Sequence, residues 1–259
     1  MKNTFLFLFL FTALLSYSCR RHTNYGAPVV KPEGILKSVM DFLIYRQSNI
    51  RLYEDFAGVG QDGSSITKET FLKFLSNGEF IPLRLTSKND STYYQLYPLD
   101  NSVNEDLRDI IKQWGQYEYT LYKMEGKALP EFNFVDINGK VYDKKTTSGK
   151  VMVLKCWFIA CVPCVAEMPA LNDLVNQYKN RNDILFVSLA FDSKENLKFF
   201  LMQHPFNYAV VPGQQNYIME ELKIGSFPTH LIINKQGMIA KVVNDNVSLA
   251  ATLGKEMLK

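Results

Sequence analysis

The chain has 259 residues, of which 47% are hydrophobic and 21% are charged, a composition typical of a globular protein rather than a disordered one. This length is enough for one large domain or two modest ones with packed cores. The formal net charge is +3, and removal of residues 1–18 takes away only Lys2, which leaves +2. Because the sequence has no long cluster of Lys or Arg, it argues against a nucleic-acid partner.

Residues 1–18 are predicted to be a signal peptide. Lys2 precedes an apolar stretch over 5–15, which is shorter than the roughly 20 residues that span a bilayer but suits a signal-peptide core. The segment resembles a bacterial lipoprotein signal, with Cys19 as the residue to be lipidated, although Ser16 stands where Leu is usual. An ordinary cleaved signal and a buried N-terminal helix remain alternatives. Either signal would place the mature protein outside the cytoplasm, where disulfides can persist.

Residues 19–34 are polar and contain Pro and Gly, so they are interpreted as a lipid-anchored tether. Residues 35–126 are predicted to form a small α+β N-terminal accessory domain without a catalytic constellation. Apolar spacing, a Thr67 cap and a Gly78 stop indicate helices, and two runs of strand-forming residues flank a turn. The expected helices lie within 35–46, 67–78 and 102–126, and the expected strands within 80–86 and 92–99.

Residues 127–259 alternate between strand and helix patterns. Asn138-Gly139 lies between two short alternating runs and predicts a hairpin. The apolar run 151–159 predicts a strand buried on both faces. This pattern indicates an α/β fold with a central mixed sheet that is flanked by helices and largely parallel in its centre. Further strands are expected at 183–191 and 208–211, a second hairpin at 228–243, and helices after Cys161 (to about Tyr178) and at 193–203, 216–223 and 247–258.

A CxxC motif, Cys161-Val162-Pro163-Cys164, lies between the end of the buried strand and the start of a helix. Pro163 fits the first helical turn, and the helix N-terminus stabilises a thiolate. Cys161 is therefore the candidate exposed nucleophile, and Cys164 the partially buried resolving thiol. Half of a zinc site is the alternative, but the sequence has no second CxxC, and its three histidines lack ligand spacing.

The stretches "FIACVPCVAEMP" and "IGSFPTHLIINKQGMI" together resemble the thioredoxin fold, in particular the TlpA-like extracytoplasmic thiol-disulfide oxidoreductases of bacterial envelopes. The resemblance covers roughly residues 128–259. It implies a redox-active Cys161–Cys164 disulfide and no other cofactor. It also implies a cis Pro228 against the cysteine pair, so that the Phe227 backbone offers an extended substrate peptide a strand-like edge. Trp157 would pack beside the site as the aromatic residue of the family does, or serve simply as a core residue.

Two charged residues bear on the cysteine pair. Glu167 matches an acidic residue of the TlpA-like members and could exchange the proton of Cys164, while a solvated helix charge is the alternative. Lys155 departs from the family, which places Asp or Asn there. A nearby ammonium would favour the Cys161 thiolate by roughly 4 kcal/mol at about 4 Å, and by little if it points away. On the first view, Lys155→Met raises the Cys161 pKa. Cys156 is expected to be a buried free thiol.

The leading hypothesis is a membrane-anchored lipoprotein on the periplasmic side of the bacterial envelope that exchanges disulfides with envelope proteins. The resemblance favours a reductant that receives its electrons from a donor in the membrane. If the protein is instead an oxidant, a membrane electron acceptor would take its place. The first alternative is a redox-inactive or metal-handling module, copper-chaperone-like, in which His230 would be a ligand. The second is a thiol peroxidase; related peroxidases place Thr or Ser three positions before the reactive cysteine, where this chain has Phe158.

Overall fold

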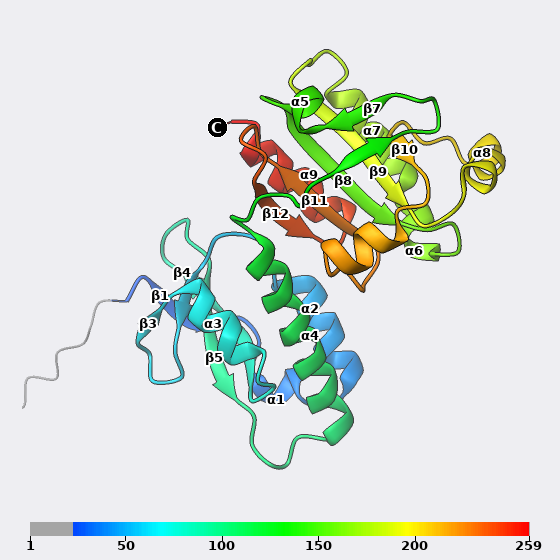
Figure 1. Cartoon of the computed structure of the whole chain (residues 1–259). Helices are drawn as coiled ribbons and strands as arrows, with labels where there is room; N and C mark the ends of the chain where they lie inside the picture. The colour runs from blue at the N-terminus through cyan, green and yellow to red at the C-terminus, as the bar shows by residue number, and fades with distance from the viewer. Residues whose placement is uncertain (1–22, 259) are drawn as a thin grey trace, which may run out of the picture.

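The computed structural model describes residues 23–258, which form two lobes joined side by side (Figure 1). The predicted signal segment and Cys19 lie outside the described residues. Within residues 23–258, none of the helices combines the length and the apolar character that a membrane span requires.

Within residues 23–126, the N-terminal lobe contains a five-stranded sheet and four helices. In spatial order its strands are β1 (Tyr25–Pro28), β4 (Phe80–Ser87), β5 (Tyr93–Pro98), β2 (Ala57–Val59) and β3 (Ser65–Ile66). Strands β2 and β5 run parallel, and the other neighbours are antiparallel. The helices are α1 (Pro32–Ile35), α2 (Val39–Asn49), α3 (Lys68–Leu75) and α4 (Glu105–Met124).

The predicted tether over 19–34 is wrong for its second half. Strand β1 pairs with β4 at the edge of the sheet, α1 follows it, and Ile35 is buried in the core. An edge strand is held by main-chain hydrogen bonds and keeps its side chains partly in water, so its sequence lacks the alternation by which strands are recognised. Residues 25–35 therefore belong to the N-terminal lobe.

Helix α4 belongs to both lobes. The Asn104 side chain caps its start by accepting a hydrogen bond from the Leu107 N–H. Leu107, Ile111 and Trp114 are buried in the core of the N-terminal lobe, whereas Leu121, nearly two turns further along, is buried in the core of the C-terminal lobe. The amphipathic pattern of this segment thus serves two different cores.

The C-terminal lobe contains a hairpin, a second five-stranded sheet, five α-helices and one π-helix, counted within residues 127–258. The hairpin strands β6 (Asn133–Val135) and β7 (Val141–Asp143) turn at Gly139, whose φ of +87° suits glycine. Parallel strands β10, β9 and β8 are followed by antiparallel β11 and β12. These strands are β8 (Val151–Trp157), β9 (Ile184–Ala190), β10 (Ala209–Val211), β11 (Thr229–Ile233) and β12 (Ile239–Val243).

One helix predicted to follow Cys161 is two in the structure. The α-helices of this lobe are α5 (Lys144–Thr147), α6 (Val162–Ala166), α7 (Met168–Gln177), α8 (Lys194–Gln203) and α9 (Asn246–Glu256), and a π-helix, η1, spans Tyr217–Glu221. The break between α6 and α7 falls at Glu167, two residues before Pro169. Proline lacks the N–H that would continue the helical hydrogen bonds, and its ring crowds the preceding turn.

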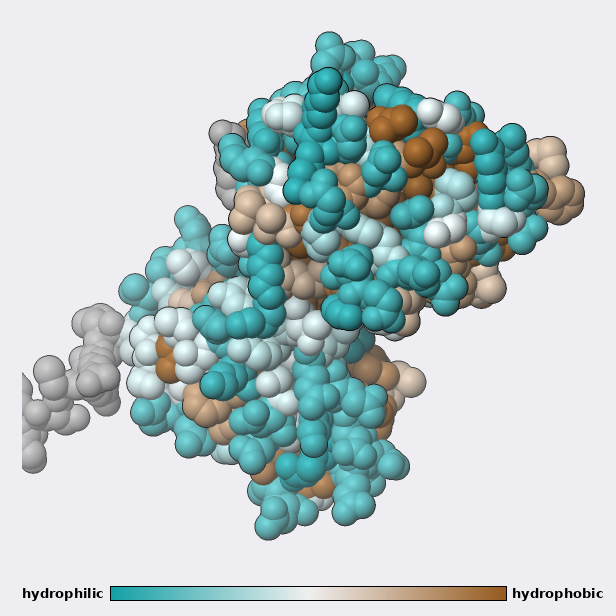
Figure 2. All heavy atoms as spheres, in the orientation of Figure 1, coloured by the Kyte–Doolittle hydropathy of each residue, from teal (hydrophilic) through white to brown (hydrophobic). Residues whose placement is uncertain are grey.

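Strand β8 is buried along its whole length, and its alternate residues face two different cores. Val151 and Val153 pack against α7 and α9 on one face. Met152, Leu154 and Cys156 pack on the other face, together with Leu121 of α4. Lys155 and Trp157 alternate onto the first face. Figure 2 shows that hydrophilic side chains cover most of the visible surface, with a small group of apolar side chains near β7 and β10.

Candidate active site

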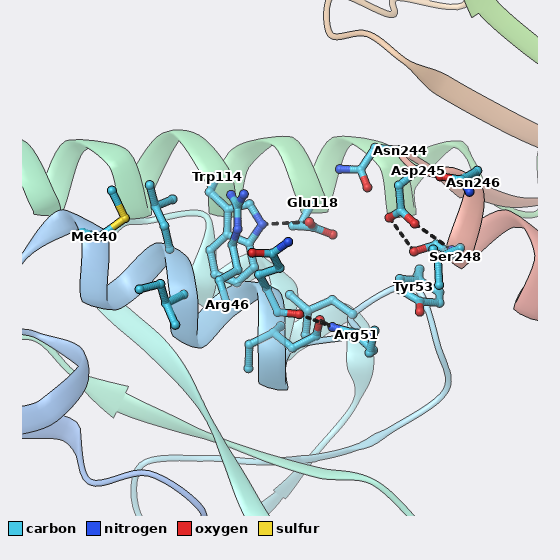
Figure 3. A pocket seen from close by; sticks show the side chains of 16 residues that line it. Met40, Arg46, Arg51, Tyr53, Trp114, Glu118, Asn244, Asp245, Asn246 and Ser248 are labelled. Carbon is cyan, nitrogen blue, oxygen red and sulfur yellow. Dashed lines mark hydrogen bonds between the residues drawn. The ribbon is translucent and has the colours of Figure 1, made fainter. Parts of the chain in front are cut away.

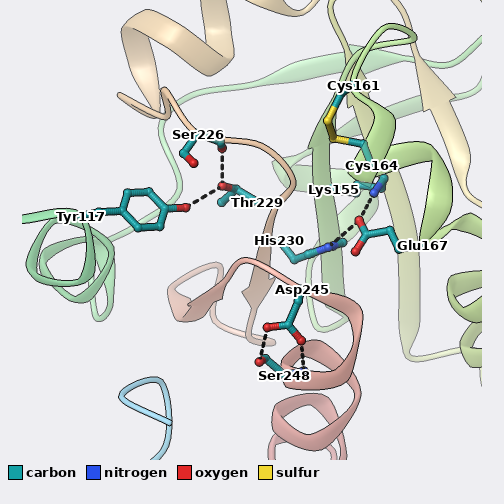
Figure 4. A network of polar contacts seen from close by, with 10 residues as sticks. All are labelled: Tyr117, Lys155, Cys161, Cys164, Glu167, Ser226, Thr229, His230, Asp245 and Ser248. Atoms are coloured by element: carbon teal, nitrogen blue, oxygen red, sulfur yellow. Dashed lines mark hydrogen bonds and ion pairs between the residues drawn. A yellow bond between two sulfur atoms is a disulfide. The ribbon is translucent and has the colours of Figure 1, made fainter. Parts of the chain in front are cut away.

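The two cysteines of the CxxC motif form a disulfide at the point where β8 ends and α6 begins (Figure 4). Their Cα atoms are 5.3 Å apart. Cys161 is the N-cap residue of α6, and Pro163 lies in the first turn, as the spacing predicts. Since β8 is fully buried, the strand fixes the point at which the chain emerges and turns into the helix.

Both sulfur-bearing residues are more deeply placed than the sequence suggests. Cys161 was expected to lie uncovered, but only 5% of its surface is exposed, and Cys164 is fully buried rather than partially. They share an apolar cluster with Trp157 and Met168. Val162, between them, is 78% exposed, so the accessible edge of the motif is the outer side of the first helical turn.

The loop before β11 closes one side of the site. The Phe227–Pro228 peptide bond is cis, as the resemblance implies. Phe227 packs against the cluster that contains both cysteines. Its ring centroid lies 5.4 Å from that of Phe158 and 5.1 Å from that of Phe191, and both contacts are edge-on. These three half-buried rings come from the ends of β8 and β9 and from the proline loop, and they form an apolar wall beside the disulfide.

Trp157 fills the space behind the cysteine pair. Its side chain is fully buried in the same cluster, and its ring centroid lies 5.8 Å from that of Phe200 and 6.1 Å from that of Phe206. The indole N–H has no hydrogen-bond partner among the described residues. Trp157 is therefore both a core residue and a neighbour of the cysteine pair.

Lys155, Glu167 and His230 meet in the interior, below the disulfide in the view of Figure 4. The Lys155 ammonium pairs with Oε1 of Glu167, and Nε2 of His230 lies 3.0 Å from the same oxygen. Lys155 and His230 are fully buried, and Glu167 is only 8% exposed. Glu167 is thus not a solvated helix charge. The Lys155 ammonium forms an ion pair with Glu167 and is not an isolated charge beneath Cys161.

For each of these three residues, burial and contact with the other members of the cluster shift the pKa in opposite directions. Burial lowers the pKa of Lys155 and of His230, although Glu167 counteracts both shifts. Burial alone would raise the pKa of Glu167, but His230 and Lys155 outweigh it and hold that pKa below its usual range. The carboxylate form of Glu167 is therefore stabilised by its two basic partners.

His230 was expected to be a strand residue, with a metal role as the alternative, and it lies in β11, but its place beside Glu167 was not foreseen. His230 pairs with Lys155 across β11 and β8, so both side chains lie on one face. His204 instead stacks on Phe200 at the end of α8. Within residues 23–258, no three His, Cys, Asp or Glu side chains gather in an arrangement that could hold a metal ion.

The N-terminal lobe contributes Tyr117, which the sequence did not indicate. The Tyr117 hydroxyl lies 3.3 Å from Oγ1 of Thr229. The Thr229 hydroxyl in turn donates a hydrogen bond to the Ser226 carbonyl at 2.7 Å (Figure 4). Helix α4 is thereby linked to both ends of the loop that contains Pro228. No local pattern marks Tyr117, because its partner lies 112 residues away in the sequence.

A separate cavity of about 640 Å³ lies between α2, α4 and the start of α9 (Figure 3). Glu118 lies in it, accepts a hydrogen bond from Nε1 of Trp114 at 2.8 Å, and has a pKa raised by burial. Arg46 stands over the Trp114 ring. Neither cysteine lines this cavity, so it is distinct from the disulfide site.

Residues 126–242 match the AhpC/TSA family. The thiol-disulfide oxidoreductase ResA of Bacillus cereus is 29% identical over 138 residues, which are 50% of this chain and 80% of that protein. ResA of Bacillus subtilis is 27% identical over 125 residues, which are 48% and 69%. Among solved structures, the thioredoxin domain of a thiol-disulfide oxidoreductase from Bacteroides vulgatus has a TM-score of 0.46 and 21% identity, and it covers 51% of this chain and 96% of its own.

The CxxC disulfide at the start of a helix and the cis proline before β11 both lie within residues 126–242. This half of the chain is thus similar to the AhpC/TSA family and to thiol-disulfide oxidoreductases of the ResA type.

Proposed function

We propose that the chain is a reductant of the bacterial cell envelope that transfers electrons from the Cys161–Cys164 dithiol to disulfides of envelope proteins. The observation that carries this proposal is the disulfide itself, at the N-terminus of α6 and beside the Pro228 loop. No feature of the described residues favours the metal-handling alternative or the peroxidase alternative over it. The reducing direction rests on the resemblance to TlpA-like proteins.

The reaction takes two steps. The Cys161 thiolate, favoured by the start of α6, attacks a substrate disulfide and forms a mixed disulfide as one substrate thiolate leaves. Cys164 then loses its proton and attacks the Cys161 sulfur. The Cys161–Cys164 bond forms, and the second substrate thiolate leaves and takes up a proton. Two electrons pass to the substrate, and an electron donor in the membrane would restore the dithiol.

The surroundings suggest how a substrate is held. The main chain at Phe227 offers an extended peptide hydrogen-bonding groups, and the Phe158–Phe191–Phe227 wall offers apolar contact. Apolar side chains next to the target cysteines would fit this wall. Residues 127–259 would thus form the catalytic unit, and residues 35–126 an accessory domain whose α4 supports the Pro228 loop.

The proposed function also includes a cellular location, the cell envelope. Residues 1–18 would be removed as a signal peptide and Cys19 lipidated, which places the protein on the periplasmic side of a membrane. The segment between Cys19 and β1 would link the anchor to the folded part. No nucleic-acid partner is expected from the charge distribution.

Insulin reduction by the purified protein without its first 19 residues tests the activity. We expect dithiothreitol-driven turnover that Cys161→Ser abolishes, and a stable mixed disulfide between Cys164→Ser and its substrate. Anaerobic incubation of the reduced protein with reduced and oxidised substrates shows in which direction electrons pass between the dithiol and the substrate. Turnover unaffected by Cys161→Ser would contradict the proposal.

A further inference from the structure

The turn that leads from β8 into the CxxC motif determines where the Cys161 sulfur lies. Cys161 is the N-cap residue of α6, and its φ of −79° and ψ of 91° are not helical. Its carbonyl accepts the Val165 N–H at 3.1 Å within the helix, and its own N–H donates to the Phe158 carbonyl at 3.1 Å. Residues 158–161 thus form a β-turn, and Cys161 is held by the helix on one side and by this turn on the other.

The end of β9 holds this turn through a side chain. Oδ2 of Asp192 accepts the N–H of Ile159, the second residue of the turn, at 2.8 Å. A β-turn bonds only the N–H of its fourth residue, so the Ile159 N–H needs an acceptor from elsewhere, and leaving it unpaired at this half-buried position would be costly. The Asp192 carboxylate therefore fixes the turn at a point two residues before Cys161.

Asp192 is itself firmly placed. The Phe191 N–H donates to the Trp157 carbonyl at 3.2 Å, which extends the hydrogen bonding between β8 and β9 beyond the two strands. On the other side, the Asp192 carbonyl accepts the Gly213 N–H at 2.9 Å. The Phe191 ring also stacks on the Phe158 ring, with centroids 5.3 Å apart. The carboxylate thus links the turn to a segment that the sheet and a neighbouring loop both support.

Reduction of the disulfide makes this support important. In the oxidised protein the S–S bond itself joins Cys161 to Cys164. Once that bond is open, only the main chain keeps the two sulfurs within reach of each other. Cys164 stays fully buried on α6, whereas the place of Cys161 depends on the turn before it. The rate at which the disulfide closes, and its stability, both rise with the effective concentration of one sulfur at the other.

We propose that Asp192 is a positioning residue that keeps Cys161 within reach of Cys164 while their disulfide is open. The proposal rests on the proposed function and deepens it. In the second step the Cys164 thiolate attacks the Cys161 sulfur, the Cys161–Cys164 bond forms, and the substrate thiolate leaves with the electron pair of the broken mixed disulfide. A turn that is held by Asp192 speeds this step and makes the dithiol a stronger reductant.

Two variants separate the hydrogen bond from the charge. Asp192→Ala and Asp192→Asn both lose the negative charge, but only the asparagine keeps an oxygen that can accept the Ile159 N–H. Reduced protein mixed with an equimolar amount of dithiobis(nitrobenzoate) should release one nitrothiolate when Cys161 attacks and a second when Cys164 resolves. We expect the second phase of Asp192→Ala to be about tenfold slower than that of Asp192→Asn, with equal first phases. A tenfold less stable disulfide also makes the potential of Asp192→Ala about 30 mV more positive.

The control is Asp100→Ala in the N-terminal lobe. Oδ1 of Asp100 accepts the Ser102 N–H at the same distance of 2.8 Å, so this variant loses a comparable hydrogen bond away from the cysteines. Both of its phases should be those of the wild type. Equal second phases in Asp192→Ala and Asp192→Asn, or an Asp192→Ala variant that slows both phases by the same factor, overturn the proposal. A wild-type protein that releases no nitrothiolate would instead refute the proposed function.

Amide hydrogen exchange tests the unmodified protein, in case Asp192→Ala does not fold. The exchange of the Ile159 N–H is followed by NMR in the oxidised and the reduced forms. We expect this N–H to be protected to a similar degree in both forms, because the Asp192 carboxylate holds the turn without help from the disulfide. Loss of its protection on reduction would overturn the proposal.

Discussion

The hydroxyl of Tyr117 lies 3.3 Å from Oγ1 of Thr229, the residue after Pro228. Because the Thr229 hydroxyl already donates its hydrogen to the Ser226 carbonyl, Tyr117 is the donor in this contact. A helix that begins in the N-terminal lobe thus holds the loop that borders the disulfide. This link gives residues 35–126 a physical role at the site.

Tyr117→Phe removes this hydrogen bond and keeps the ring. We expect a loss of roughly 1 kcal/mol in the free energy of unfolding and weaker binding of a peptide disulfide, because the Pro228 loop loses one of its supports. The Michaelis constant for a peptide disulfide and urea unfolding measure the two effects. Tyr119→Phe is the matched control, since Tyr119 lies on α4 and packs against the N-terminal core. Equal effects of both variants would contradict the role of Tyr117.

Lys155→Met leaves Glu167 buried without its ammonium partner. Breaking a buried ion pair in this way costs about 3–5 kcal/mol, so the variant should unfold at markedly lower urea concentration. The double variant Lys155→Met/Glu167→Gln removes both charges and should recover part of the loss. A single variant as stable as the wild type would show that the pair contributes little. Because the ammonium is paired, we expect the Cys161 pKa to change less than an isolated lysine would imply.

Cys156 should be inert in the folded protein. It is fully buried on the face of β8 opposite to Lys155, and burial raises the pKa of its thiol to about 12. Iodoacetamide applied to the reduced protein at pH 8 should therefore label Cys161 quickly and Cys156 only at the rate of unfolding. Mass spectrometry of the peptides distinguishes the two. Labelling of Cys156 as fast as that of Cys161 would contradict the structure.

Gly115 allows α3 and α4 to touch. A Cβ at this position would lie 2.3 Å from the Leu75 carbonyl oxygen, and main chain cannot move aside cheaply. Gly115→Ala gains up to about 1 kcal/mol in helix propensity but should lose more through overpacking, so the net change is destabilising. Gly254→Ala in α9, where nothing lies within 4 Å, should instead stabilise by roughly 0.5–1 kcal/mol. Urea unfolding compares the pair, and the same sign for both would refute the argument.

Local chemistry predicted much of the C-terminal lobe. The Asn138-Gly139 turn, the continuous apolar run of β8 and the proline in the first turn after Cys161 each have a short-range cause, and each lies where expected. The break at Glu167 also has a local cause in Pro169, but the apolar spacing over the two helices concealed it. Strand β1 was missed because its partner, β4, lies more than 50 residues away.

The site was harder to foresee because its decisive contacts join distant segments. The sequence indicated Lys155 and Glu167 separately, and each was considered for its effect on the cysteines rather than as a partner of the other. Glu167 lies at the α6–α7 break when it pairs with Lys155, and the β8–β11 register places His230 beside them. The exposure of Cys161 was overestimated for a related reason, since a helix start does not reveal which rings pack over it.

Cys161 and Cys164 should form a reversible two-electron couple, which equilibration in thiol-disulfide buffers of graded potential measures. The dithiol fraction is followed by alkylation and mass spectrometry. We predict a single transition in which the ratio of dithiol to disulfide changes tenfold for every 29.6 mV or so, the same in both directions, and lost in Cys164→Ser. A folded protein whose cysteine pair stays in one state across the whole range would show that the pair is not a redox couple.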